Sequence, residues 1–408
     1  MLIGKFFKNI NPKYKNHYFS GLSFNSIATK KNNIFFSIKG TNINGNKFIQ
    51  DAIKKGARTI VSNLNFQGLK SKVLYIKTNN SRKILSEVAS KLYQKKPKNL
   101  IAVTGTNGKS SIADFYFQIL KLNNKKVASI GTLGVKTHLN NLIINNTTLD
   151  PISLNQHLEK IKKLNIDNVI LEASSHGLKQ NRLNGMDFKT GIFTNLSRDH
   201  LDYHKSYKDY LKSKLMLFRN LLKKNSNVIT DIDISQYKII KNITKKKQMK
   251  IFTIGSKKSY LELIKHHYKD HKQIFQIKYK NKIYKITVNL IGKVQIKNIL
   301  MAMIAAEKSN IKFKKIVESI NKIKNANGRF EKIGYLKNNS KIILDYAHTP
   351  DALNNCLQNL HEQFINRKIS IVFGCGGDRD KAKRAQMGKI VNKFCHKIYL
   401  TDDNPRFE

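Results

Sequence analysis

The chain has 408 residues, 40% of them hydrophobic, and this length and composition suit two or three domains with cores of their own. It contains no run of about 18 apolar residues and no apolar stretch before an N-terminal cleavage site, so we expect a cytoplasmic protein with no membrane span. Its cysteines, Cys356, Cys375 and Cys395, have neither metal-site spacing nor the numbers for a disulfide framework.

The formal net charge of +50 first suggests nucleic acid binding. However, lysine is spread along the whole chain together with abundant Asn and Ile, a bias typical of AT-rich coding sequences. No basic stripe alternates with aromatic residues, and Trp is absent. We therefore expect no nucleic acid partner and keep charge-driven RNA binding as a rival hypothesis. Arginine is scarcer, and six of the ten lie in the motifs described below: Arg182, Arg198, Arg329, Arg379, Arg384 and Arg406.

The order of predicted elements indicates three α/β domains. Short apolar runs alternate with polar turns over residues 1–95, and residues 93–100 are typical of a linker. Strands separated by helices follow over 96–327, which predicts a parallel sheet with right-handed crossovers. The alternating segment 274–291 predicts a hairpin with its turn at Lys280-Asn281, followed by a helix over about 295–308. A third α/β pattern occupies 328–408.

A candidate phosphate-binding loop, "GTNGKSS" (Gly105 to Ser111), follows an apolar strand and precedes a predicted helix. Glycines allow backbone N–H groups to converge on phosphate oxygens, and a helix N-terminus adds positive potential. Lys109 would reach the outer phosphates, and Ser110 or Ser111 would bind Mg²⁺. The spacing differs from the common loop motif, because Val103 stands where that motif has its first glycine.

Two further polar clusters follow predicted strands of the same domain. Glu172 ends an apolar strand, where a carboxylate is unfavourable unless it is paired, and Mg²⁺ is one possible partner. The segment "FTNLSRDHLDYH" (193–204) follows the next strand. His200 and His204 have a spacing that could ligate a metal, although carboxylates and phosphates favour a hard ion over zinc.

In the last predicted domain, polar clusters follow three strands, at 343–353, at 372–384 and around Asp403 and Arg406. Ligands of open α/β sheets bind outside the carboxyl ends of the strands. These clusters therefore predict one site that lies between domains.

Taken together, the segments resemble the Mur ligase family, in particular its members that add the third residue of the peptidoglycan stem peptide. The segments "GTNGKSS", "EASSHGLKQNR", "FTNLSRDHLDYH", "YLKSKLMLF", "GRFE", "DYAHTPDAL", "FGCGGDRDKAKR" and "DDNPR" occur in the family's order and spacing, from about residue 20 to the end. The resemblance implies a central P-loop ATPase domain (96–327), a small N-terminal UDP-sugar-binding domain (1–95) and an incomplete Rossmann-like C-terminal domain that binds the amino acid (328–408).

The resemblance also implies the roles of particular residues. ATP would be held by Gly105, Thr106, Asn107, Gly108, Lys109, Ser110, Ser111, Asn298, Arg329 and Asp345. Ser110, Glu172 and a carbamylated Lys214 would hold Mg²⁺, with His200 close to the metal, so that Lys109, Glu172, His200 and Lys214 form the catalytic set. UDP-MurNAc-L-Ala-D-Glu would contact Ser26, Thr41, Asn42, Ile43, Asn146, Thr147, Thr148, Ser174, Gln180 and Arg182. Arg379, Asp403, Asn404, Pro405 and Arg406 would select meso-diaminopimelate.

The reaction implied is an ATP-dependent amide ligation through an acyl phosphate, carried out by a monomer. Three departures from the family pattern stand out: Asn25-Ser26-Ile27 near the start, Val294-Gln295 before the 295–308 helix, and a chain that ends about 80 residues early. The last predicts a fragment or a truncated gene product. Rival hypotheses are a lysine-adding or folylpolyglutamate-type ligase, or an impaired protein that only binds ATP or the UDP-sugar.

Overall fold

The computed structural model of the chain describes residues 1–7, 9–40, 43–377 and 381–408. These residues form two compact units. The first contains Met1–Pro97, Leu149–Leu164 and His176–Met186, and the second contains Lys98–Thr148, Asn165–Ser175 and Asp187–Glu408. The bounds predicted for three domains stay a prediction. Three predicted substrate residues, Thr41, Asn42 and Arg379, lie outside the described residues.

The first unit is built on a 5-stranded sheet in the order β1-β2-β3-β5-β4, in which only the β4–β5 pair is antiparallel. Its elements are η1 (Ile3–Lys5), η2 (Pro12–Tyr14), β1 (Gly21–Ser23), β2 (Asn33–Phe36), η3 (Gly45–Phe48), α1 (Ile49–Lys54), β3 (Thr59–Ser62), β4 (Gly68–Lys70), β5 (Val73–Lys77), α2 (Ser81–Leu92) and α4 (Pro151–Lys163). The helix α5 (Ser175–Lys179) begins in the second unit and ends in the first.

Local sequence explains how α4 begins. The Asp150 carboxylate accepts hydrogen bonds from the backbone N–H groups of Ile152 and Ser153, and Pro151 occupies the first helical position, where its missing N–H is not needed. The segment after α5 is held on α2, because Ser86 Oγ donates to the carbonyl of Asn181 at 2.6 Å.

The second unit contains an 11-stranded sheet in the order β16-β15-β14-β13-β12-β11-β6-β10-β7-β8-β9. Its elements are β6 (Asn99–Thr104), α3 (Lys109–Leu122), β7 (Val127–Gly131), β8 (Gly134–Lys136), β9 (Asn141–Leu142), β10 (Asn168–Glu172), β11 (Phe188–Phe193), α6 (Tyr207–Met216), the π-helix η4 (Leu217–Leu221), β12 (Asn227–Asp231), α7 (Tyr237–Lys246), β13 (Lys250–Gly255), β14 (Leu261–Lys269), β15 (Lys272–Tyr279), β16 (Lys282–Val288), α8 (Val294–Glu307), α9 (Phe313–Ile320), β17 (Glu331–Tyr335), β18 (Lys341–Leu344), α10 (Pro350–Gln363), β19 (Ser370–Phe373), α11 (Ala382–Phe394) and β20 (Lys397–Leu400).

The predicted parallel sheet is found in the middle of this unit, where neighbouring strands from β14 to β7 are parallel. Antiparallel strands extend it at both ends, and the sequence did not indicate those at β8 and β9. The predicted hairpin is confirmed, because β15 and β16 pair across Lys280 and Asn281. Both turn residues have positive φ, at 44° and 64°, the geometry that a two-residue hairpin turn requires.

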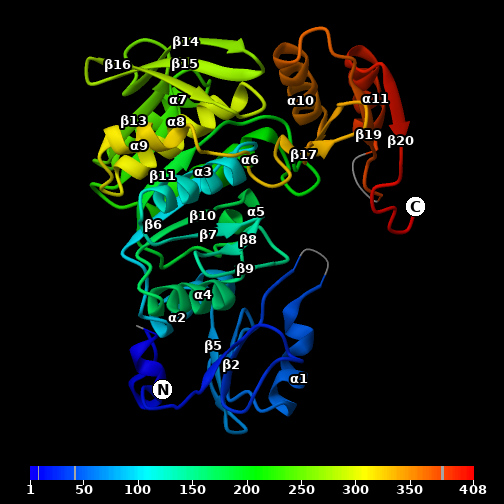
Figure 1. Cartoon of the computed structure of the whole chain (residues 1–408). Helices are drawn as coiled ribbons and strands as arrows, with labels where there is room; N and C mark the ends of the chain where they lie inside the picture. Colours follow the sequence, from blue (N-terminus) through cyan, green and yellow to red (C-terminus); the bar gives the residue numbers. More distant parts are fainter. Residues whose placement is uncertain (8, 41–42, 378–380) are drawn as a thin grey trace. The chain divides into compact units, whose positions relative to one another are not determined.

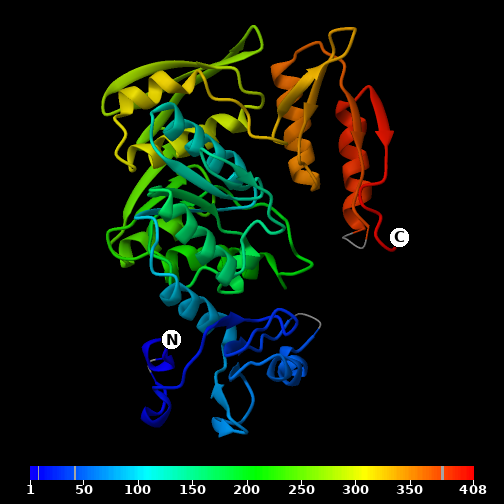
Figure 2. The same cartoon turned by 60° about the horizontal axis from the view of Figure 1, so that its bottom comes forward.

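Helices cover both faces of the central sheet. α3, α8 and α9 share one hydrophobic core with inward residues of the strands, such as Val103 and Ile192, and lie side by side in Figures 1 and 2. The neighbouring Gly191 points the other way, where a side chain would meet Phe218 and Leu222 at the end of the π-helix. This layering confirms the α/β fold class.

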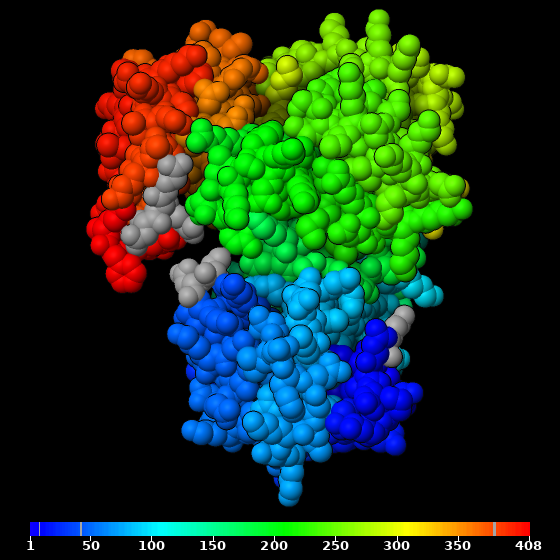
Figure 3. All heavy atoms as spheres, turned by 180° about the vertical axis from the view of Figure 1, so that it is seen from behind, coloured from blue at the N-terminus to red at the C-terminus, as the bar shows by residue number. Residues whose placement is uncertain are grey.

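The edge formed by β14–β16 is strongly basic. Side chains of this yellow-green part of the chain project into solvent in Figure 3.

None of the helices in the described residues is long and apolar enough to cross a membrane.

The last part of the chain has the predicted order of strands and helices, but its strands form two small sheets. β17 pairs with β18 antiparallel, and β19 pairs with β20 parallel. α10 begins at Pro350 after Thr349, whose hydroxyl accepts from the backbone N–H of Ala352. Its residues Leu353 and Leu357 pack against Met387 and Val391 of α11, which gives this part a core of its own.

Candidate active site

The phosphate-loop candidate has the backbone conformation that its sequence predicts. β6 ends at Thr104, Gly105 and Gly108 have positive φ of 148° and 87°, and α3 begins at Lys109. These φ values favour glycine, and a Cβ on Gly108 would lie only 2.5 Å from Asn298 Oδ1. The loop is therefore a strand–turn–helix cradle whose tight packing depends on both glycines.

The segment after β11 holds this loop in place through hydrogen bonds. Thr194 Oγ1 donates to the carbonyl of Asn107 at 2.6 Å, and the backbone N–H of Asn107 donates to Asn195 Oδ1 at 2.9 Å. The backbone N–H of Ser197 donates to Thr106 Oγ1 at 3.0 Å. These bonds fix the loop conformation before any ligand arrives, and the sequence did not single out Thr194, Asn195 or Ser197.

A cavity of about 430 Å³ opens over the loop. Of the predicted nucleotide and catalytic residues, all but Gly105 line it: Thr106, Asn107, Gly108, Lys109, Ser110, Ser111, Glu172, His200, Lys214, Asn298, Arg329 and Asp345. The structure thus brings together groups from β10, the segment after β11, α6, α8 and the strand end after β18. Among the described residues of the three strand-end clusters predicted to share one site, only those of the cluster at 343–353 line this cavity.

Glu172 is a buried carboxylate at the end of β10, with 2% of its surface exposed. Ser110 Oγ donates to its Oε2 at 3.1 Å, and the backbone N–H of Thr132 donates to Oε1 at 2.9 Å. Thr132 Oγ1 also donates to Oε2, at 3.2 Å. Sequence reasoning missed Thr132, although it directly follows the end of β7 at the same sheet edge and could have been found by that rule.

Lys109 folds back over its own loop, where its Nζ donates to the carbonyls of Gly105 and Thr106 at 3.0 and 2.7 Å. Burial lowers the pKa of Lys109, while the carboxylates of Glu172 and Asp199 act in the opposite direction. The ammonium group is thus held by neutral carbonyls, which an anion could replace.

Lys214 on α6 is 1% exposed, and its Nζ donates to the carbonyl of Gly105 at 2.7 Å and lies 4.3 Å from the centre of the Tyr210 ring. Burial, reinforced by the nearby Lys109, holds the pKa of Lys214 well below its usual value, and Asp199 only partly opposes this. A lysine with a lowered pKa loses its proton more easily than an exposed lysine, which favours its amine as a nucleophile.

The two histidines of the 193–204 segment have different environments. His200 lines the cavity with its Nε2 3.4 Å from Asp199 Oδ2, and burial lowers its pKa. His204 is fully buried and its Nε2 lies 3.0 Å from Ser175 Oγ. Only His200 lines the cavity, so a metal site shared by both histidines has no support from the cavity lining and stays a prediction. The described residues contain no cluster of three or more His, Cys, Asp or Glu arranged for a metal ion.

The far wall of the cavity comes from the last part of the chain. The Arg329 guanidinium lies 4.4 Å from the centre of the Tyr346 ring, and Asp345 Oδ2 accepts from the backbone N–H of Phe330 at 2.9 Å. Burial raises the pKa of Asp345. Gln295, one of the departures from the family pattern, also lines the cavity and accepts from Asn298 Nδ2 at 2.9 Å.

The predicted substrate residues are found in several places. Thr147 and Ser174 line the cavity, and Thr148 Oγ1 donates to the carbonyl of Glu172 at 2.8 Å, whereas Asn146 is exposed outside it. In the first unit, Arg82 and Arg182 both donate to Gln180 Oε1. Sequence reasoning missed Arg82. Ser26 is buried and Ile43 is 56% exposed in the same unit.

Residues Asp403, Asn404, Pro405 and Arg406 do not line the cavity. They are exposed after β20 and pack on the glycine-rich segment after β19, where Gly376 forms a β-bridge with Asp403 and the backbone N–H of Gly377 donates to the carbonyl of Asn404 at 3.1 Å. The quartet is therefore held against the segment that leads to Arg379.

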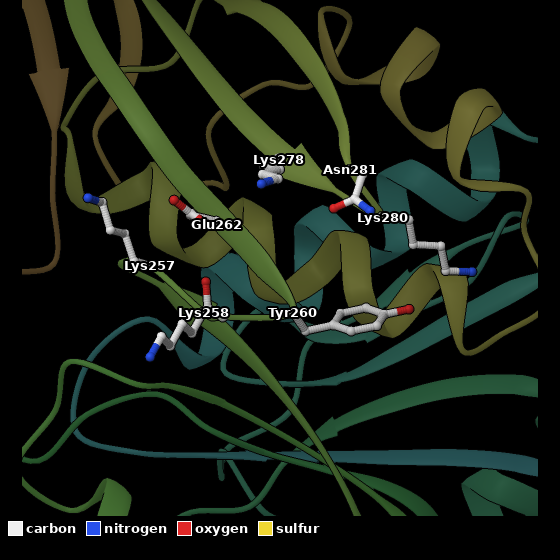
Figure 4. A pocket seen from close by; sticks show the side chains of 8 residues that line it. Lys257, Lys258, Tyr260, Glu262, Lys278, Lys280 and Asn281 are labelled. Atoms are coloured by element: carbon white, nitrogen blue, oxygen red, sulfur yellow. The ribbon is translucent and has the colours of Figure 1, made fainter.

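A second hollow, of about 490 Å³, lies on the β14–β16 ribbon and contains none of the predicted site residues. It is lined by Lys257, Lys258, Ser259, Tyr260, Glu262, Lys278, Lys280 and Asn281. Figure 4 shows Lys280 pointing away from Lys257 and Lys258, so these lysines do not converge on one point. The positive charge of this hollow is part of the basic surface that β14–β16 form.

A glycine-rich cradle at the carboxyl edge of a parallel sheet, with a buried lysine and a serine–carboxylate pair, defines a nucleotide-binding α/β protein. Residues 103–306 match the Mur ligase middle domain, and residues 328–408 match the Mur ligase glutamate ligase domain. The chain belongs to the Mur ligase family.

Two curated relatives illustrate the likeness. The UDP-N-acetylmuramoyl-L-alanyl-D-glutamate–2,6-diaminopimelate ligase of Rickettsia prowazekii (strain Madrid E) is 39% identical over 405 residues, which are 98% of this chain and 83% of that protein. The protein of the same name from Chelativorans sp. (strain BNC1) is 35% identical over 389 residues, 95% of this chain and 80% of that protein.

Solved structures agree with this placement. A UDP-N-acetylmuramoyl-L-alanyl-D-glutamate–2,6-diaminopimelate ligase structure has a TM-score of 0.79 at 29% identity and covers all of this chain and 83% of that one. The MurF ligase of Thermotoga maritima in complex with ADP has a TM-score of 0.64 at 16% identity, covering 94% of this chain and 88% of that one, which shows the shared fold alone.

Proposed function

We propose that the chain is an ATP-dependent ligase that joins meso-diaminopimelate to UDP-MurNAc-L-Ala-D-Glu through an acyl phosphate. The observation that carries the proposal is the cavity in which Lys109, Ser110 and Glu172 face Arg329 and Asp345, in a chain 39% identical to relatives named for this reaction. We further propose that it acts as a cytoplasmic monomer with three domains over 1–95, 96–327 and 328–408, without a nucleic acid partner.

The chemical difficulty is that a carboxylate must attack a triphosphate, and both are anions. Lys109 supplies a positive charge directly at the loop, and the carbonyls that now hold its ammonium group are weaker partners than phosphate oxygens. Arg329 adds further positive charge along the cavity wall. In our proposal these groups hold ATP and offset its repulsion of the substrate carboxylate.

The residues present also fit Mg²⁺. Mg²⁺ prefers oxygen ligands, and the Glu172 carboxylate and Ser110 hydroxyl lie 3.1 Å apart on the cavity wall. The backbone N–H and the hydroxyl of Thr132 donate hydrogen bonds to the two carboxylate oxygens and so fix the orientation of the Glu172 carboxylate. Bound Mg²⁺ would neutralise phosphate charge during transfer. Carbamylation of the Lys214 amine would add another oxygen ligand on the same cavity wall.

Other predicted contacts belong to the same proposal. Thr147 and Ser174 line the cavity and would bind the dipeptide end of the UDP-sugar. In the first unit, the Arg82–Gln180–Arg182 cluster offers two guanidinium groups for an anionic part of that substrate. Arg406 would recognise the second carboxylate of meso-diaminopimelate with its planar fork of donors.

The test is an assay of phosphate release with ATP, Mg²⁺ and UDP-MurNAc-L-Ala-D-Glu, comparing meso-diaminopimelate with L-lysine, with the product identified by mass spectrometry. We expect tripeptide only with meso-diaminopimelate. Preference for lysine or for a folate substrate would identify a rival ligase, and ATP binding without any product would support the binding-only alternative. Salt-sensitive retention on a polyanion without any ATP-dependent reaction would favour RNA binding.

A further inference from the structure

Behind the cavity wall, a serine, an imidazole and a carboxylate lie in line. Ser175 Oγ is 3.0 Å from His204 Nε2, and His204 Nδ1 is 3.5 Å from Asp209 Oδ2. Ser175 lines the same cavity as Glu172 and Ser174, whereas the His204 side chain is completely buried. The three residues come from the start of α5, the segment after β11 and the first turn of α6, and all three belong to the second unit.

The imidazole is held in a fixed orientation. Its ring packs against Tyr203 and Tyr210, with ring centres 5.0 Å away in both cases, and its backbone N–H donates to the carbonyl of His200 at 2.9 Å. Asp209 is positioned in turn, because its backbone N–H donates to Ser206 Oγ, the cap of α6. A serine, an imidazole and a neighbouring carboxylate form the kind of arrangement by which proteins move a proton to or from a hydroxyl.

The order of donors follows from the chemistry of the three groups. The 3.5 Å between His204 Nδ1 and Asp209 Oδ2 is not a hydrogen bond, but the negative charge of an ionised carboxylate so close to Nδ1 favours the tautomer with the proton on Nδ1. His204 Nε2 is then an acceptor, and the Ser175 hydroxyl donates to it. The Ser175 oxygen therefore has only lone pairs left to offer the cavity. It suits a ligand that donates a proton, such as an amine, better than a phosphate or a carboxylate.

We propose that Ser175, His204 and Asp209 form a proton relay for the amine that attacks the acyl phosphate, an inference that rests on the proposed function. The ammonium group of the incoming amino acid passes one proton to Ser175 Oγ while the Ser175 hydroxyl proton passes to His204 Nε2, and the neutral nitrogen that results bonds to the acyl carbon. The imidazolium formed lies next to the Asp209 carboxylate. The bond between the acyl carbon and the phosphate oxygen then breaks, and phosphate leaves with its electron pair and takes the second N–H proton.

This relay can be separated from acyl phosphate formation by using two nucleophiles. Hydroxylamine is a weakly basic amine that is largely unprotonated at neutral pH, so it traps the acyl phosphate as a hydroxamate with little need of a base. Diaminopimelate carries strongly basic amines and needs one. The full chain is assayed with each nucleophile, for the parent and for His204→Gln, Ser175→Ala and Asp209→Asn. His267→Gln, which changes an exposed histidine on β14, is the matched control.

We expect diaminopimelate ligation by His204→Gln and Ser175→Ala to fall about 100-fold while hydroxamate formation stays within roughly threefold, the size of effect typical of a general base. An equal fall with both nucleophiles, or no fall with either, would overturn the relay. Ser175→Ala keeps the test decisive if the buried His204 variant does not fold. A parent chain that forms neither product would contradict the proposed function itself, which is a different result.

Discussion

The role of Glu172 can be tested without changing Glu172, by the substitution Gly131→Ala at the end of β7. A Cβ on Gly131 would overlap the Glu172 carboxylate, lying 2.6 Å from its Cδ and its Cγ. The φ of Gly131 is not in the left-handed region, so the substitution adds no backbone strain. The carboxylate must therefore move, and it loses its hydrogen bonds from Thr132 and Ser110.

The expected magnitudes follow from these contacts. Overpacking a buried site costs about 1–3 kcal/mol of the free energy of unfolding, and rotation of Glu172 into the cavity keeps the loss toward the lower end. A displaced carboxylate should slow ATP-dependent phosphate release about 100- to 1,000-fold, or about 2.7–4 kcal/mol of barrier, as for other electrostatic groups at reacting phosphates and acyl centres. We therefore expect a large loss of rate with a small loss of stability.

The assay measures phosphate release at several Mg²⁺ concentrations, together with the melting temperature. Gly388→Ala, in α11 with no atom within 4 Å of its added Cβ, is the matched control and should melt at the same or a higher temperature with unchanged activity. If Gly131→Ala released phosphate at the parent rate, Glu172 would not need its present position, and the metal-ligand role would be refuted. Partial recovery at high Mg²⁺ would support that role.

Three other predictions concern the remaining charged groups. Lys109→Ala should reduce phosphate release at least 100-fold, or roughly 2.7 kcal/mol, with an almost unchanged melting temperature, and retained turnover would exclude the loop from the mechanism. Because burial lowers the pKa of Lys214, its amine loses a proton at a lower pH than an exposed lysine does. Carbamylation in bicarbonate, detected by mass spectrometry, should therefore increase as the pH rises through that lowered pKa. The Lys214→Arg variant should show no carbamylation at this position. Arg406→Lys should raise the KM for meso-diaminopimelate about tenfold, because a bidentate charged contact contributes roughly 1.5–3 kcal/mol. An equal rise in the KM for ATP would show that this residue does not recognise the amino acid.

Much of the site could be predicted because its signals are local. A strand, two glycines and a helix start are consecutive in the chain, so the conformation around Gly105 and Gly108 follows from their own φ preferences. The turn at Lys280-Asn281 is equally local. The strand-end position of Glu172 could also be predicted, because an acidic residue at the end of an apolar run is recognisable from the sequence alone.

Other parts of the site were not visible because they depend on partners far apart in the chain. Thr132 is an ordinary residue until β7 and β10 pair and place it beside Glu172. Arg82 lies 98 residues from Gln180, and no local pattern connects them. His204 was considered as a metal ligand because of its spacing from His200, whereas packing against Tyr203 and Tyr210 buried its side chain.

The amino-acid sequence by itself determined the α/β class, the phosphate-loop conformation and the kinds of groups available to a site, because each depends on residues close together in the chain. Tertiary structure decided which of these groups meet. Hydrogen bonding between strands brought Thr132 to Glu172, and burial changed Lys214 from one of many surface-type lysines into an amine with a lowered pKa. Desolvation and contact are properties of neighbours in space, and a sequence pattern does not contain them.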